Sequence, residues 1–320
     1  MLQLLLIPVL GLAPGLLWLW LIYRNNKNRP EPKGLVIRTF LLGMAVVIPV
    51  AFVELALMLP YIISNIHNLN MDTFNTMSLG QTAYTSFVVA GMTEEFFKFL
   101  VVRTTIYKSP YYDEPLDGLI YSSASALGFA SLENIEYLVT YGVPTALVRA
   151  PLTTMAHCVF SAMWGYPLAL KKLKKKHSTL LLYLGLAGAM IGHGLFDFLA
   201  FQQTGDKLNI PVILGLIVLF GGLVTFFIYL IKRGQKTSPY IDKNDRLLVS
   251  CSNCQNHVPY YADFCPICGT PLWGNKDQYK SFCGKCGSEV PGGTNFCTAC
   301  GSRLSKKPEP AKMPSHLPVQ

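Results

Sequence analysis

The chain has 320 residues, of which 51% are hydrophobic and only 14% are charged. A soluble domain carries about 25% charged residues, and several apolar runs here exceed the ~18 residues that mark a membrane span, which excludes an ordinary soluble protein. The formal net charge of +9 does not indicate nucleic-acid binding, because most Lys and Arg lie in short loops between apolar runs, where they set membrane topology.

Seven apolar segments are predicted to cross the bilayer as helices, so the expected fold class is an all-α polytopic membrane protein. In chain order they are Met1–Tyr23, Leu35–Leu59, Gly80–Val102, Asp117–Thr140, Leu147–Ala169, Thr179–Phe201 and Ile210–Ile231. The first segment has no basic residues ahead of its apolar stretch and exceeds the apolar region of a signal peptide, so we expect a retained helix.

The charges of the loops predict the orientation of the chain in the membrane. Basic residues occupy alternate loops, namely Arg24, Lys27, Arg29 and Lys33, then Arg103 and Lys108, then five lysines between 171 and 177, then Lys232 and Arg233. The loops between them contain a single lysine or arginine residue, Lys207. By the positive-inside rule, we expect a multi-pass protein of the cell membrane with its N-terminus outside and its C-terminal tail in the cytosol.

Eight cysteines in the tail form two units of identical spacing, each with two C-x2-C pairs that ten residues separate. The units are Cys251, Cys254, Cys265 and Cys268, and Cys283, Cys286, Cys297 and Cys300. Four thiolates suit a tetrahedral structural Zn²⁺ with no open coordination position, and Gly269, Gly287 and Gly301 suit tight turns after three of the pairs. Disulfides are the alternative, which a cytosolic location disfavours.

These segments give an expected domain organisation. We expect a transmembrane domain at 1–231, a basic linker at 232–247, zinc ribbons at 248–272 and 280–304, and a disordered tail at 305–320. Cytosolic ribbons behind a basic linker suggest a docking site for a cytosolic protein.

Ionisable residues inside the predicted spans are costly in lipid and therefore indicate a functional site. Those that cluster are Glu94, Glu95 and Lys98 in the third span, Glu133 and Glu136 in the fourth, His157 in the fifth, and His193 and Asp197 in the sixth. At about 1.5 Å of rise per residue, Glu94, Glu95, His157 and His193 fall in one layer on the order of 10 Å thick. Two histidines with a carboxylate can bind a catalytic metal or activate water without one.

The order and spacing of these residues resemble the PrsW family of intramembrane proteases, which is related to the CAAX prenyl proteases and bacteriocin-processing enzymes. The matching motifs are Glu94-Glu95-x-x-Lys98, Phe129-Ala130-x-x-Glu133-Asn134, His157 and His193-x-x-x-Asp197, and the resemblance covers roughly residues 10–205. It implies regulated intramembrane proteolysis of a membrane-anchored protein, such as an anti-sigma factor for the family's namesake. The zinc ribbons lie outside the family's pattern.

The resemblance also implies a role for each residue. Glu94 and Glu95 would be the catalytic pair, with the choice of general base left open. His157 and His193 would bind a metal, with Zn²⁺ expected, or polarise water and the scissile carbonyl. Among the supporting residues, Lys98 would neutralise a carboxylate, Glu133 would be a further ligand or a structural partner, Asn134 would donate to the oxyanion, and Asp197 would orient a histidine.

Other interpretations remain open from the residues alone. Glu94 and Lys98 could form only a buried ion pair, and a single buried histidine is usually a packing residue. Glu136 and Arg149 lie near the outer ends of their helices and are expected to pair or to reach the interface, and Glu54 is expected to behave similarly. Cys158 is expected to fill space. A proton-coupled transporter or a non-catalytic scaffold that recruits partners through its ribbons would also place polar groups in these spans.

Overall fold

A computed structural model describes residues 2–26, 30–64, 77–202, 209–238, 247–260, 262, 265, 268–272, 280–291, 294–302 and 304. The chain divides into two compact units: Met1–Arg24 with Gly34–Gly234, and Asn25–Lys33 with Gln235–Gln320. The expected disordered tail at 305–320, half of the linker (239–246), and much of the loop after the second span (65–76) lie outside the described residues.

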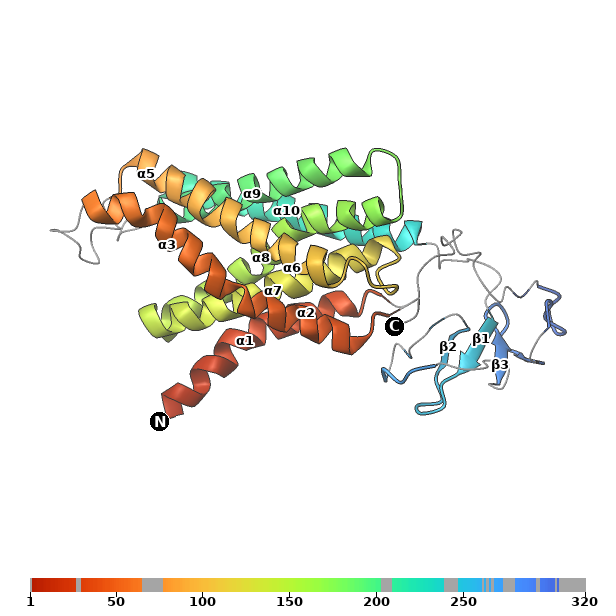
Figure 1. Ribbon diagram of the computed structural model, residues 1–320. Coiled ribbons are helices and arrows are strands. Elements are labelled where there is room, and N and C mark those ends of the chain that lie inside the picture. Colours follow the sequence, from red (N-terminus) through yellow and green to blue (C-terminus); the bar gives the residue numbers. More distant parts are fainter. Residues whose placement is uncertain are drawn as a thin grey trace. The chain divides into compact units, whose positions relative to one another are not determined.

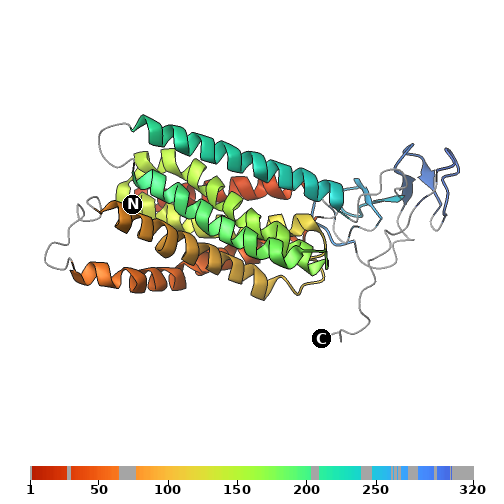
Figure 2. The ribbon, with the colours of Figure 1, turned by 90° about the horizontal axis from the view of Figure 1, so that it is seen from above.

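The first unit is a bundle of helices (Figures 1 and 2). The helices are α1 (Leu2–Tyr23), α2 (Lys33–Ala45), α3 (Val47–Ser64), α5 (Leu79–Tyr84), the π-helix η2 (Thr85–Met92), α6 (Thr93–Thr105), α7 (Pro115–Tyr141), α8 (Val143–Lys172), α9 (Ser178–Phe201) and α10 (Ile210–Thr237). Each of the seven expected spans corresponds to one helix or to consecutive helices, with α2 and α3 forming the second and α5, η2 and α6 forming the third.

Several helix ends differ from the sequence-based boundaries. Helix α3 runs through Pro60 to Ser64, because a membrane helix tolerates the one lost backbone hydrogen bond when neighbouring groups compensate. Gly142 alone separates α7 from α8, and its φ of 79° is a conformation that glycine adopts without strain. Helix α10 continues through Thr237 and takes in the first part of the expected linker.

Helix α7 forms the centre of the bundle. It packs against α1 and α8, and α8 packs in turn against α9 (Figure 1). The polar side chains of Ser122, Ser123, Ser125 and Ser131 on α7 are fully buried. Four segments of the described residues are long and apolar enough to cross a membrane, namely Leu6–Tyr23, Lys33–Ser64, Ser178–Phe201 and Ile210–Thr237. The protein is thus a mostly helical membrane protein whose central helix buries several polar side chains.

The second unit contains a small antiparallel sheet in the order β2-β1-β3-β4. Its strands are β1 (Leu247–Ser250), β2 (His257–Pro259), β3 (Ser281–Cys283) and β4 (Glu289–Val290). Strand β1 pairs with β2 of its own ribbon and with β3 of the following ribbon. The two ribbons therefore share one sheet.

Candidate active site

The helix series α5–η2–α6 carries the first two carboxylates of the site. Ser78 begins the series with a capping box, in which its hydroxyl accepts from Gln81 N and Gln81 Oε1 accepts from Ser78 N. The π-helical segment ends at Met92, directly before Glu94 and Glu95. Such π-helical insertions widen a turn and often occur at functional sites.

Lys98 connects these carboxylates with helix α8. Its Nζ lies 2.9 Å from Glu94 Oε2 and 3.0 Å from Glu95 Oε1, and it lies 2.8 Å from His157 Nδ1. The ammonium also stands 4.2 Å from the centre of the Phe129 ring, which adds a cation–π contact. The ion pair expected from the sequence is therefore present, and it includes a histidine.

The partners of His157 determine which of its nitrogens carries the proton. Lysine can only donate, so Nδ1 accepts from Lys98. Nε2 then carries the proton and faces Glu133 Oε2 at 2.9 Å. Glu133 therefore contacts His157 directly from α7.

His193 comes from α9 and meets the cluster from the other side. Its ring stacks on Phe160 with 5.1 Å between centres and meets the His157 ring edge-on at 4.9 Å. Nε2 lies 3.8 Å from Glu94 Oε2 and 3.4 Å from Asp197 Oδ2. Nδ1 lies 3.4 Å from Glu95 Oε1, in a geometry that falls short of a hydrogen bond.

The two adjacent glutamates occupy different environments. Glu95 is 0% exposed, and its Oε2 accepts hydrogen bonds from Ser161 Oγ at 2.8 Å and from Trp164 Nε1 at 3.0 Å. Glu94 instead lines a cavity of about 530 Å³. Only Glu94 of this pair borders the space that a substrate could enter.

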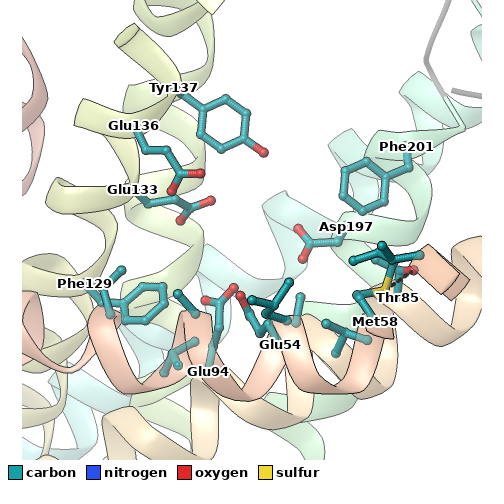
Figure 3. Close-up of a pocket in the computed structure, with 17 residues that line it drawn as sticks. Glu54, Met58, Thr85, Glu94, Phe129, Glu133, Glu136, Tyr137, Asp197 and Phe201 are labelled. Atoms are coloured by element: carbon teal, nitrogen blue, oxygen red, sulfur yellow. Dashed lines mark hydrogen bonds between the residues drawn. The ribbon is translucent and has the colours of Figure 1, made fainter. Parts of the chain in front are cut away.

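The cavity lies between α3, η2, α6, α7 and α9 and is strongly acidic (Figure 3). Its carboxylate residues are Glu54, Glu94, Glu133, Glu136 and Asp197. Glu136 and Glu54 were each expected to form an ion pair or to reach the membrane interface, whereas in the structure both line this cavity. Sequence position alone could not reveal this, because it does not show which face of a helix meets its neighbours.

Two residues near the cluster do not join it. Asn134 Nδ2 donates to Thr154 Oγ1 at 2.9 Å and to Gly11 O at 3.4 Å, so its amide links α7 with α8 and α1. Cys158 is fully buried and donates to Ser123 Oγ at 3.1 Å, which agrees with a packing role.

Glu94, His157 and His193 offer a donor set that fits Zn²⁺. Each supplies one ligand atom, and these atoms lie within 4.8 Å of one another in a buried position. Zinc bonds to nitrogen and oxygen of about 2.0–2.2 Å place tetrahedral ligands roughly 3.3–3.6 Å apart, so small side-chain shifts would complete the site. Lys98 contacts two of the three groups, so its ammonium and a metal would compete for their lone pairs.

The tail cysteines form two further metal sites. The Sγ atoms of each set of four lie within 4.8 Å of one another, with separations of 3.5–3.7 Å across the pairs Cys251–Cys268, Cys254–Cys265, Cys283–Cys300 and Cys286–Cys297. These distances exclude disulfides and match the ~3.8 Å edge of a tetrahedron of thiolates around Zn²⁺. Hydrogen bonds from the Thr270 side chain and backbone lower the pKa of the Cys268 thiol to about 6, which favours the thiolate that binds metal.

The turns of the ribbons repeat the same backbone arrangement. The residue after each C-x2-C pair donates its N–H to the carbonyl of the first cysteine and has a positive φ. In three pairs this residue is glycine, as expected (Gly269, Gly287 and Gly301), and in the first pair it is Gln255.

Comparison with known proteins identifies the family. The sequence model described as PrsW family intramembrane metalloprotease matches residues 31–231. The chain belongs to the PrsW family. A double zinc ribbon model matches residues 251–306 of this PrsW-family protein.

Several PrsW proteases are similar to the chain over most of their own length. Protease PrsW of Oceanobacillus iheyensis is 36% identical over 193 residues, which are 59% of this chain and 80% of that protein. Protease PrsW of Geobacillus kaustophilus is 33% identical over 189 residues, 59% of this chain and 77% of that protein. Protease PrsW of Bacillus subtilis is 31% identical over 190 residues, 59% of this chain and 80% of that protein. No solved structure matches the chain.

The sequence alone left open whether the protein is an enzyme, a transporter or a scaffold. Membership in the PrsW family favours the enzyme. The protein is an intramembrane protease, and its Glu/His cluster within the helical bundle fits the catalytic site of such an enzyme. Its substrates are accordingly membrane-anchored proteins.

Proposed function

We propose that Glu94, His157 and His193 form the hydrolytic centre at which this protein cleaves peptide bonds of membrane-anchored proteins. One observation carries the assignment: the ligand atoms of these three residues lie within 4.8 Å of one another, and Glu94 lines the cavity. A zinc ion bound by the three residues would polarise water and the scissile carbonyl.

Glu94 is our choice for the general base, and Glu95 for an orienting carboxylate. Glu94 Oε2 faces Lys98 and the histidines, whereas its Oε1 has no such contact among the described residues. Oε1 can therefore take a proton from water as the water oxygen bonds to the carbonyl carbon. The same proton then passes to the leaving amine as the C–N bond breaks.

The remaining polar residues would hold this geometry. Glu133 keeps the proton of His157 on Nε2, so that the lone pair of His157 Nδ1 faces Lys98 and Glu94. Asp197 lies near His193 Nε2 and would tighten the site around the ligand atoms. Asn134 is assigned to helix packing instead of to the oxyanion, because its amide donates hydrogen bonds to Gly11 of α1 and Thr154 of α8.

Proteolysis in liposomes that contain a library of single-span substrates tests this assignment. Glu94→Gln should abolish cleavage, His193→Ala should abolish cleavage together with the zinc of the bundle, and Glu95→Gln should reduce cleavage. Glu289→Gln is the matched control, because Glu289 is an exposed residue of the tail. Cleavage by Glu94→Gln at the wild-type rate would overturn the proposal.

The orientation in the membrane is a further part of the proposal. The loop charges support an N-terminus outside the cell membrane and zinc ribbons in the cytosol. Protease added to intact spheroplasts should then remove an N-terminal tag and spare a C-terminal one. The opposite pattern would reverse the topology.

We also propose domain boundaries and a role for the ribbons. The boundaries are a protease domain at 1–231, a linker at 232–247, ribbons at 248–272 and 280–304, and a disordered tail at 305–320. The ribbons would dock a cytosolic protein, and an anti-sigma factor is one candidate substrate class. A chain that ends after Thr237 should cleave purified substrate normally and cleave its cellular substrate more slowly, and equal cleavage in cells would refute the docking role.

A further inference from the structure

Glu95 is held by two donors that no motif of the sequence pointed to. Ser161 Oγ and Trp164 Nε1 both donate to Glu95 Oε2, at 2.8 and 3.0 Å. Ser161 follows His157 by four residues on α8 and Trp164 follows Ser161 by three, so the three side chains share one face of that helix. This face of α8 supplies both a histidine of the site and the donors that hold its buried carboxylate.

Neither donor can easily point elsewhere. Both side chains are 0% exposed. The Trp164 ring packs edge-on against Phe99 of α6, with 5.5 Å between ring centres and an interplanar angle of 88°. The indole N–H is a donor only, so Glu95 satisfies it in a position where an unpaired N–H would be destabilising.

The two hydrogen bonds to Oε2 fix the direction of the other oxygen. With Oε2 held by α8, Glu95 Oε1 faces Lys98 Nζ at 3.0 Å and His193 Nδ1 at 3.4 Å. The other nitrogen of His193, Nε2, is the one that faces Glu94 and Asp197. Asp197 therefore faces Nε2 and is not the partner of Nδ1, and Glu95 is the carboxylate that faces Nδ1.

A histidine that binds metal through one nitrogen usually donates its other N–H to a carboxylate, and loss of this partner weakens metal binding about 10–100-fold. A small rotation of the His193 ring would bring Nδ1 within hydrogen-bond distance of Glu95 Oε1, which leaves Nε2 as the ligand atom. This arrangement requires that Glu95 does not turn.

We propose that Ser161 and Trp164 are positioning residues, which hold Glu95 so that it orients His193 for metal binding beside Glu94. The inference rests on the proposed function, since it concerns the same site. Among the described residues, neither lines the cavity or supplies a metal-ligand atom, so both act through Glu95.

The test compares Ser161→Ala and Trp164→Phe with Ser131→Ala and Trp18→Phe in the full-length protein. The first two remove one hydrogen bond to Glu95 and keep most of the side-chain volume. The control Ser131 is a buried serine that donates within its own helix to Leu127 O, and Trp18 of α1 packs against the hydrophobic core of the bundle. The zinc affinity of the bundle is measured by competition with a chelator. The zinc bound by the ribbons is measured in His193→Ala, which lacks the zinc of the bundle, and is subtracted.

We expect each α8 variant to bind zinc in the bundle about 10–100-fold more weakly than its control, with a lower kcat, an unchanged KM and an unfolding temperature close to that of the control. Zinc affinity equal to the control would overturn the inference, and so would a wild-type bundle that binds no zinc. If Trp164→Phe does not fold, Ser161→Ala decides, because it removes a single oxygen atom. Wild-type cleavage that Glu94→Gln abolishes, together with α8 variants equal to their controls, would refute this inference and leave the proposed function intact.

Discussion

Gly91 in η2 and Gly194 in α9 approach each other so closely that a Cβ atom on Gly91 would stand 2.8 Å from the backbone nitrogen of Gly194. A Cβ on Gly194 would in turn lie 2.7 Å from Cα of Phe87 in η2. Both contacts are with backbone atoms, which no change of rotamer can move. Because His193 precedes Gly194 and Glu94 follows Gly91 by three residues, this close approach sets the distance between the histidine and the carboxylates.

Gly194→Ala should therefore lower both stability and cleavage. Overpacking a close helix contact costs about 1–3 kcal/mol, and the added methyl group would push α9 away from η2. Gly221→Ala is the control, because no heavy atom lies within 4 Å of its added Cβ. Thermal unfolding in detergent and the cleavage rate measure the two effects, and a Gly194→Ala protein as stable and active as Gly221→Ala would contradict the close contact.

Glu54→Gln should weaken substrate binding more than it slows the chemical step. Glu54 lines the cavity beside Glu94 and has no hydrogen bond to either histidine among the described residues. Loss of a hydrogen bond worth about 0.5–1.5 kcal/mol predicts a KM roughly 2–10-fold higher with a similar kcat. Met58→Leu changes the same wall of the cavity without altering charge and serves as the control. A fall in kcat as large as that of Glu94→Gln would instead indicate that Glu54 takes part in proton transfer.

Lys98→Met should destabilise the metal-free protein severely. The fully buried ammonium contacts Glu94, Glu95 and His157, and removal of one partner from a buried charge cluster costs about 3–5 kcal/mol. Lys108→Met removes an equal charge from an exposed position and should change little. The free energies of unfolding of the two variants in chelator would be compared, and equal values would show that the ammonium does not hold the cluster together.

Cys251→Ser should disturb both zinc ribbons. Strand β1 places Val249 in the apolar core of the first ribbon and Leu247 in that of the second, so the two cores share one strand. We expect the variant to bind less than one zinc ion in the tail, where the unaltered protein binds two, and to become sensitive to trypsin in both ribbons. Cys158→Ser, in the bundle, should keep both ions. Loss of a single ion with the second ribbon intact would show that the ribbons fold independently.

Hydropathy and cysteine spacing predicted the elements of this fold, because both are local properties of the chain. Long apolar runs became the helices, and the repeated C-x2-C pairs became two metal sites with glycine at the expected turns. The boundaries were less accurate at Pro60 and Gly142, where packing between helices decides how far a helix extends.

The membrane-buried polar residues predicted the core of the site but not its walls. Glu94, His157 and His193 come together because their depths in the three helices match. The rotation of each helix about its axis is set by packing, so the sequence could not show that Glu54 faces the cavity or that Asn134 bonds to α1 and α8. Ser161 and Trp164 carried no signal, because neutral residues in an apolar helix are usually part of the packing.

The single-residue connection at Gly142 has a consequence for the biogenesis of the protein. Helix α7 is not among the four described segments that are apolar enough to cross a membrane by themselves, and much of its length is buried against other helices. A helix of this kind partitions poorly into lipid alone, so α7 and α8 would leave the translocation machinery as a hairpin. Substitutions in α1 or α8 far from the catalytic groups would then lower the yield of inserted enzyme by depriving α7 of its partners.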